Sequence, residues 1–178
     1  MFYTAFILAS YHEMTEEVMY KRPSKTKQPE SETHAYEYCM FLLNIRLRSE
    51  GELRYGMTQR GYIESVIEKV INRLLEMKYI DDNRFLEILV DNYKKYKNYG
   101  YMMIKKKLIE KRLSRETIES GMTEYFPPED ELAVAKRFIK KEKLTTTTQE
   151  DKQKLVRKLQ ARGFRMDAIM KVVSVQID

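Results

Sequence analysis

The stretch that decides the fold is LRYGMTQRGYIESVI, at residues 53–67, because its pattern returns twice further along the chain. At an offset of 51 residues stands IKKKLIEKRLSRETI, at 104–118, and another 51 residues on stands LVRKLQARGFRMDAI, at 155–169. Each copy has two apolar residues four apart, a polar turn, an apolar residue directly after the turn, and another one five residues later. This order predicts a helix, a tight turn and a second helix, repeated three times.

Glycine and serine place the ends of these helices. Gly61 and Gly163 hold equivalent positions, and glycine takes the left-handed backbone that ends many helices without a steric penalty. The equivalent residue in the middle copy is Arg112, so we expect that turn to be either strained or built differently. Ser49 and Glu52 have the spacing of a capping box, which predicts a helix start at Ser49. Apolar residues three and four apart predict the following helix over residues 63–75.

A longer amphipathic run precedes each copy, at residues 35–47, 85–96 and 132–139. Asp81 and Asp82 mark the entry to a second unit, and Pro127 and Pro128 mark the entry to a third. We therefore predict an all-α chain of three tandem three-helix repeats: an N-terminal extension and linker (1–34), repeat 1 (35–80), repeat 2 (81–126) and repeat 3 (127–178). Because a unit of about 50 residues buries little apolar surface alone, we expect the repeats to stack into a short, curved solenoid.

The composition fits a folded helical chain. Its 178 residues are 43% hydrophobic and 34% charged, and only 6 glycines and 4 prolines are available for hairpin turns. The single cysteine, Cys39, cannot form an internal disulfide, which favours a reducing, intracellular setting. The longest nearly apolar run, residues 2–9, is too short to span a bilayer and lacks the basic residues of a signal peptide. We therefore expect a cytoplasmic protein.

The sequence contains no recognisable catalytic constellation. It has no glycine-rich phosphate loop and no metal-ligand spacing, and its two histidines offer no obvious base for a serine or cysteine nucleophile. Cys39 lies on the apolar side of the first predicted helix and is interpreted as a core residue. Asp81 and Asp82 are interpreted as helix caps rather than as paired catalytic carboxylates. We expect a protein that is not an enzyme and that carries no cofactor and no metal.

The net charge of +6 is arranged in bands along the chain. Basic residues outnumber acidic ones by 8 in residues 94–115 and again by 8 in residues 136–165, whereas residues 116–135 carry a net charge of −6. Such banding favours a surface that meets nucleic acid or an acidic protein. A solvated helical face would produce the same bands, so the charge alone leaves both interpretations open.

The cations recur in repeat register. Lys106 and Lys107 of repeat 2 correspond to Arg157 and Lys158 of repeat 3, and Lys111 corresponds to Arg162. We interpret the two sets as matching basic ridges. A cation at a helix end is also stabilised by the helix dipole, which gives Lys111 and Arg162 a structural explanation as well.

A second basic stretch mixes four tyrosines with three lysines. Such a mixture suits contacts with phosphates and stacking on bases, although a core position would equally explain Tyr93 and Tyr96. The tyrosines are Tyr93, Tyr96, Tyr99 and Tyr101. The candidate residues for binding DNA or a filament are Lys94, Lys95, Lys97, Lys106, Lys107, Lys111, Arg157, Lys158 and Arg162.

At several of these positions the sequence resembles the RecX family, bacterial regulators of the RecA recombinase. The resemblance covers about residues 35–175 and departs from the family pattern at Leu86 and in the turn at residues 111–113. The matching residues are Tyr79-Ile80-Asp81-Asp82-Asn83-Arg84-Phe85, Tyr99-Gly100 followed by Ile104 and Leu108, and Arg60-Gly61-Tyr62 with Ile67. The resemblance implies a non-enzymatic helical modulator that lodges in the groove of the RecA filament on single-stranded DNA. We expect it to be a monomer. There it would restrain ATP hydrolysis, strand exchange and filament growth.

Other functions stay open at this point. A helix, a glycine turn and a second helix also describe a helix-turn-helix protein that binds duplex DNA directly. Glu64 and Glu68 on the second helix of repeat 1 argue against reading of the major groove. A helical scaffold for an acidic protein partner, or an RNA-binding protein that uses the tyrosine-lysine stretch, would have the same composition.

Overall fold

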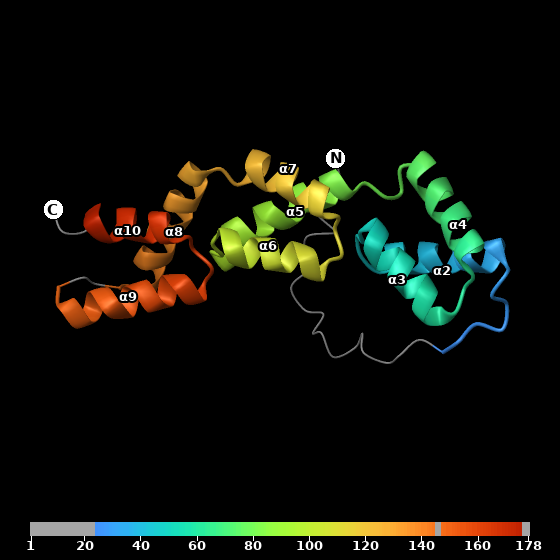
Figure 1. The fold of residues 1–178 in the computed structure, drawn as a ribbon, viewed down its shortest axis with the longest axis horizontal. Coiled ribbons are helices and arrows are strands. Elements are labelled where there is room, and N and C mark those ends of the chain that lie inside the picture. The colour runs from blue at the N-terminus through green and yellow to red at the C-terminus, as the bar shows by residue number, and fades with distance from the viewer. Residues whose placement is uncertain (1–23, 145–146, 176–178) are drawn as a thin grey trace. The chain divides into compact units, whose positions relative to one another are not determined.

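The computed structural model of the protein describes residues 24–144 and 147–175, and the regular structure within them is entirely helical (Figure 1). This confirms the predicted all-α repeat fold. The chain divides into two compact units, the first ending at Ile80 and the second beginning at Asp81. Among the described residues, no helix is long and apolar enough to cross a membrane.

The first unit contains a bundle of three helices, α2 (Glu32–Ile45), α3 (Glu50–Arg60) and α4 (Glu64–Glu76). Helix α4 matches the helix predicted over residues 63–75. It packs mainly on α2, and its apolar face is buried. The core of this unit consists of Ala35, Cys39, Leu53, Met57, Tyr62, Val66, Ile67, Val70, Ile71, Leu74 and Ile80.

The second unit contains two further bundles. The first is made of α5 (Asp82–Asn92), the π-helical segment η2 (Tyr93–Lys97), α6 (Tyr101–Glu110) and α7 (Arg115–Tyr125). The second is made of α8 (Pro128–Glu142), α9 (Gln149–Ala161) and α10 (Met166–Val175). In both, the first helix packs mainly on the third, as α2 does on α4. The three repeats therefore share one helix arrangement.

Short polar side chains start most of these helices. The side-chain oxygen of each capping residue accepts a hydrogen bond from the backbone N–H three residues further on, which satisfies one of the free amides of the first turn. The capping residues are Ser31, Ser49, Asp81, Ser114 and Thr148. Pro128 stands in the first turn of α8, where its missing N–H costs nothing. The interpretation of Asp81 as a cap is thereby confirmed.

The turn after the middle helix has the same construction in all three repeats. Gly61, Arg112 and Gly163 have φ angles of 90°, 57° and 81°, so all three adopt the left-handed conformation. The following residue closes a six-residue hydrogen-bonded loop at 3.2, 3.4 and 3.1 Å, from Tyr62 to Met57, from Leu113 to Leu108 and from Phe164 to Leu159. This is the Schellman pattern. Of the two alternatives for Arg112, the strained turn is the one the chain adopts.

Replacing Arg112 by glycine is expected to stabilise the second unit by about 0.5 to 1 kcal/mol. A side chain in the left-handed conformation costs about 1 to 2 kcal/mol, and the greater freedom of glycine in the unfolded chain offsets part of the gain. The urea midpoint of Arg112→Gly, followed by helical circular dichroism, tests this. A lower midpoint would show that contacts of the Arg112 side chain outweigh the backbone strain.

The single cysteine lies in the core of repeat 1. Cys39 is fully buried, and burial raises the pKa of its thiol to about 12. Because the thiolate is the reactive form, the thiol should be inert in the folded protein at neutral pH. We expect Ellman's reagent to label Cys39 only as repeat 1 unfolds in urea. Rapid labelling in buffer at pH 7 would contradict the burial of this helix face.

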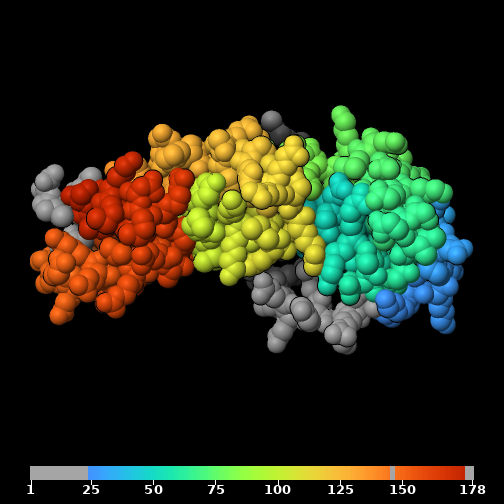
Figure 2. Space-filling view, in the orientation of Figure 1, coloured from blue at the N-terminus to red at the C-terminus, as the bar shows by residue number. Residues whose placement is uncertain are grey.

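Repeats 2 and 3 are joined by hydrogen bonds between their backbones. The Gly100 N–H donates to the Arg162 carbonyl at 2.9 Å, and the Met102 N–H donates to the Gly163 carbonyl at 2.8 Å. The turn of repeat 3 therefore lies against the first turn of α6. The approach is close because neither glycine has a Cβ: one added at Gly100 would lie 2.3 Å from the Phe164 nitrogen. The space-filling view shows repeat 3 packed directly against repeat 2 (Figure 2).

A buried carboxylate completes this junction. Glu131 in the first turn of α8 has no exposed surface. Its Oε1 accepts from the backbone N–H groups of Tyr101 and Arg165, each at 3.0 Å, and its Oε2 accepts from Arg165 Nε at 2.6 Å. Tyr101 begins α6 and Arg165 directly precedes α10, so the carboxylate caps the positive ends of two helices at once. These partners explain how the structure accommodates a buried charge.

Candidate nucleic-acid interface

The two helices that carry the predicted basic ridges meet end to end. The backbone bonds of Gly100 and Met102 place the start of α6 against the turn that ends α9. In Figure 1 both helices lie along the lower edge of the second unit. The helices that carry the two predicted ridges therefore follow one another within this unit.

On α6, the three predicted cations differ in their surroundings. Lys106 is exposed. Lys107 Nζ lies 2.8 Å from Glu110 Oε2, and this contact lowers the pKa of the Glu110 carboxyl. Lys111 is half-buried where the helix ends. Lys106 is thus the member of this ridge most available to a partner.

Of the three predicted cations of repeat 3, Arg157 is the exposed one, and it contacts Gln153 at 3.5 Å. Lys158 Nζ lies 3.6 Å from a carboxylate oxygen of Glu142. Arg162 donates from Nη1 to the Lys97 carbonyl at 3.0 Å, and its guanidinium lies 5.0 Å from the centre of the Phe138 ring. Arg162 therefore holds the repeat 2–repeat 3 junction together.

The three lysines of η2 divide in the same way. Lys94 Nζ binds the Tyr125 carbonyl at 2.7 Å and Asp130 Oδ2 at 2.8 Å, and its side chain is 18% exposed. Lys95 is exposed and pairs with Asp91 at 2.5 Å, which raises the pKa of Lys95. Lys97 is also exposed. Lys95 and Lys97 face solvent, while Lys94 anchors η2 to the start of α8.

The four tyrosines of this stretch have two different roles. Tyr93 and Tyr99 are half-buried, with ring centroids 5.9 Å apart. Tyr101 stacks on Phe126 with a centroid distance of 6.4 Å. Tyr96 is 66% exposed. The core interpretation left open for Tyr96 is thus wrong, and it applies to Tyr93 only in part.

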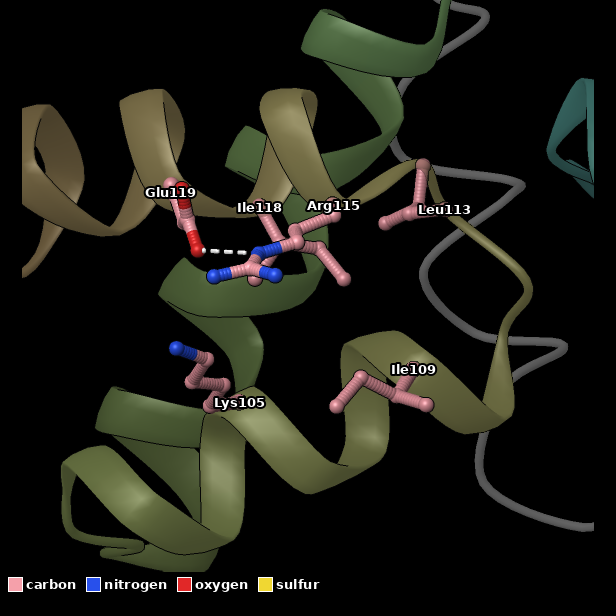
Figure 3. A pocket seen from close by; sticks show the side chains of 6 residues that line it. All are labelled: Lys105, Ile109, Leu113, Arg115, Ile118 and Glu119. Atoms are coloured by element: carbon pink, nitrogen blue, oxygen red, sulfur yellow. Dashed lines mark hydrogen bonds and ion pairs between the residues drawn. The ribbon is translucent and has the colours of Figure 1, made fainter.

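A groove between α6 and α7 adds two cations that the sequence pattern did not single out. It has a volume of about 410 Å³, and Ile109, Leu113 and Ile118 form its apolar lining. Figure 3 shows Lys105 pointing from α6 toward Arg115 and Glu119 on α7, so that the charged groups gather at one end. Arg115 Nε lies 2.7 Å from Glu119 Oε1, which lowers the pKa of Glu119. Lys105 was missed because repeat register singled out only its neighbours.

The cations of α4 have partners within repeat 1. Lys69 pairs with Glu32, and the Arg73 guanidinium lies 4.3 Å from the centre of the Tyr36 ring. Glu68 faces outward and binds Arg54 of α3 at 2.5 Å. This helix therefore presents carboxylates beside cations that are already paired, which does not favour binding in the major groove.

Comparisons with known proteins find similarity to RecX proteins along most of the chain. Residues 35–74 match the family model "RecX, first three-helix domain", and residues 129–173 match "RecX, third three-helix domain". The regulatory protein RecX of Mycobacterium sp. (strain JLS) is 30% identical over 162 residues, which cover 87% of this chain and 88% of that protein. The regulatory protein RecX of Vibrio parahaemolyticus is 33% identical over 142 residues, covering 79% and 90% of the two chains.

The fold is also similar to solved structures. The crystal structure of RecX from Lactobacillus salivarius superposes with a TM-score of 0.71 over 82% of this chain and 96% of that one, at 19% sequence identity. A second crystal structure, of a regulatory protein RecX, gives a TM-score of 0.68 over 79% of this chain and 72% of that one, at 20% identity. At these identities the superpositions support the helical-repeat fold.

Proposed function

Because the chain belongs to the RecX family of regulatory proteins, we propose that it is a non-enzymatic regulator of a RecA-type recombinase. In this proposal a single copy acts in the cytoplasm and binds in the groove of the RecA filament on single-stranded DNA. Bound there, it restrains ATP hydrolysis, strand exchange and filament extension. The resemblance of the sequence to this family supplies the partner.

The observation that carries the proposal is the meeting of α6 and α9 end to end. The two helices come from different repeats, and each carries an exposed cation, Lys106 on α6 and Arg157 on α9. A line of cations of this kind attracts the regularly spaced phosphates of a nucleic acid backbone. A filament groove offers such phosphates together with protein surface, which suits exposed cations on two successive helices.

The direct test is the DNA-dependent ATPase of a purified RecA protein, measured with increasing amounts of this chain. We expect inhibition at amounts well below one copy per RecA monomer, because a molecule lodged in the groove blocks extension of a whole filament. An unchanged ATPase, together with tight binding to duplex DNA alone, would instead support the helix-turn-helix alternative.

Replacing Lys106 and Lys107 by glutamate is expected to weaken binding to single-stranded DNA and to reduce its dependence on salt. Each phosphate contact contributes about −0.7 to the slope of log affinity against log salt for single strands, so losing two contacts should flatten the slope by about 1.4. The double variant Arg157→Glu, Lys158→Glu should lower the affinity and flatten the salt slope by similar amounts. Titrations of a labelled oligonucleotide at several salt concentrations measure both quantities.

A matched control is Lys27→Glu with Lys69→Glu, which changes the net charge equally at exposed residues of the first unit. We expect this variant to keep most of the affinity and the parental slope. If both double variants lose affinity equally, the effect comes from total charge, and the ridges are a solvated face.

A further inference from the structure

The segment η2 breaks the regular hydrogen bonding of the helix that precedes it. Its N–H and carbonyl groups follow the wider π-helical pattern, in which the Asn98 N–H donates to the Tyr93 carbonyl five residues earlier. Asn98 then takes a left-handed conformation, with φ of 50°, and is almost fully buried. Single π-turns of this kind cost stability and occur often at functional sites.

Two arginines of repeat 3, together with Lys94 of the segment itself, hold this turn in place. Arg137 of α8 donates to Asn98 Oδ1 at 2.8 Å and also to the Lys94 carbonyl. Arg162 donates to the Lys97 carbonyl, and Lys94 itself reaches Asp130. The carbonyls that the π-turn leaves without helical partners are thus bound by side chains of repeat 3. The conformation of η2 is specified by the neighbouring repeat.

The fixed turn presents one aromatic ring to solvent. Tyr96 is the most exposed of the large apolar side chains in the described part of the chain. Lys95 and Lys97 flank it and are exposed too. The Lys95–Asp91 pair is a surface pair of residues four apart, which a phosphate can readily replace. An exposed ring between two cations is the arrangement that stacks on an unpaired base while its phosphates are neutralised.

We propose that Tyr96 is a base-stacking residue and that η2 is a contact site for single-stranded DNA. The inference rests on the proposed function only for the choice of ligand. In that function the chain meets the single-stranded DNA inside the filament, and we assign this contact to η2. An acidic protein segment would also bind the lysines but would not need a free ring face. Stacking on a base uses both features, so the observations favour nucleic acid.

The test compares binding of the full chain, without recombinase, to a 20-nucleotide oligo(dT) and to an abasic strand with the same number of phosphates. Stacking contributes roughly 10-fold per base to affinity, so Tyr96→Ala should lose about 10-fold on oligo(dT) and nothing on the abasic strand. Tyr96→Phe keeps the ring and should bind like the parent. Equal binding of the parent to both strands would overturn the proposal, as would a Tyr96→Phe variant as weak as Tyr96→Ala.

A second measurement reports the contact directly, because the chain contains no tryptophan. Tyr96→Trp introduces one indole, whose fluorescence should be quenched by oligo(dT) and not by the abasic strand. The matched control is Phe41→Trp, at a residue of similar exposure, 62%, on α2. Quenching of both indoles alike, or of neither, would overturn the proposal. Loss of stacking with intact ATPase inhibition would refute this inference alone, whereas stacking without inhibition would refute the proposed function alone.

Discussion

Replacing Gly163 by alanine should destabilise the second unit by about 2 to 5 kcal/mol, one of the two largest effects we expect. Two costs add at this position. The left-handed conformation, with φ of 81°, costs a side chain about 1 to 2 kcal/mol. The new Cβ would also lie 2.3 Å from the Met103 nitrogen, and overpacking of this kind costs about 1 to 3 kcal/mol.

Two other glycines separate these costs. Gly61 has the same conformation, but the nearest atom to an added Cβ is the flexible Lys25 side chain at 3.2 Å. Gly61→Ala should therefore cost only the backbone term, about 1 to 2 kcal/mol. Gly100 has a φ of −81° that any residue adopts, but its Cβ would meet the Phe164 backbone. Gly100→Ala should cost only the packing term, about 1 to 3 kcal/mol.

Hydrogen exchange read by mass spectrometry suits this comparison, because it reports the opening free energy of each segment separately. Gly163→Ala and Gly100→Ala should increase exchange in α6 and α9 and leave α2 to α4 unchanged. Gly61→Ala should do the reverse. If Gly61→Ala and Gly163→Ala cost the same, the close backbone approach between repeats 2 and 3 is wrong.

Replacing Glu131 by alanine should destabilise the same junction by about 3 to 5 kcal/mol. The change leaves the Arg165 guanidinium and two backbone N–H groups without their acceptor, and breaking a buried ion pair from one side has a cost of this size. Arg165 is 31% exposed and gains some hydration, which places the expected value at the lower end of the range.

Glu129→Ala is the control, because Glu129 is an exposed carboxylate in the same helical turn. It should change stability by less than about 0.5 kcal/mol. The urea midpoint of the second unit measures both variants, with Ellman labelling of Cys39 reporting the first unit separately. A Glu131→Ala variant as stable as the parent would show that water replaces the carboxylate at the two helix ends.

The sequence predicted the candidate site as a set of cations. The structure divides this set into cations that bind backbone carbonyls and cations that are exposed to solvent. The tyrosine-lysine pattern identified Lys94, and repeat register identified Arg162 together with Lys106 and Arg157. Both patterns record position in the sequence and not the surroundings of a side chain. In the structure the first two bind backbone carbonyls, while the second two are exposed. The difference between the two groups of cations depends on contacts between residues that are 31 and 65 positions apart in the sequence. A local sequence pattern cannot predict such contacts.

The sequence by itself determined the helix-turn-helix pattern of the repeats, the caps at Ser49 and Asp81 and the turns at Gly61 and Gly163. These depend on interactions within a few residues: apolar spacing selects a buried face, Ser49 and Asp81 satisfy nearby amides, and Gly61 tolerates the left-handed backbone. Even the departure at Arg112 keeps the turn, because the flanking residues Leu108 and Leu113 are buried as their counterparts are.

Only the tertiary structure decided how repeats 2 and 3 join. Glu131 stands in an acidic stretch and was counted there as surface charge, yet it is buried at the starts of α6 and α10. The π-turn at η2 likewise follows from Arg137 and Arg162, which lie on other helices. A buried polar group is stable only when distant partners meet it, and this requirement becomes visible once the chain has folded.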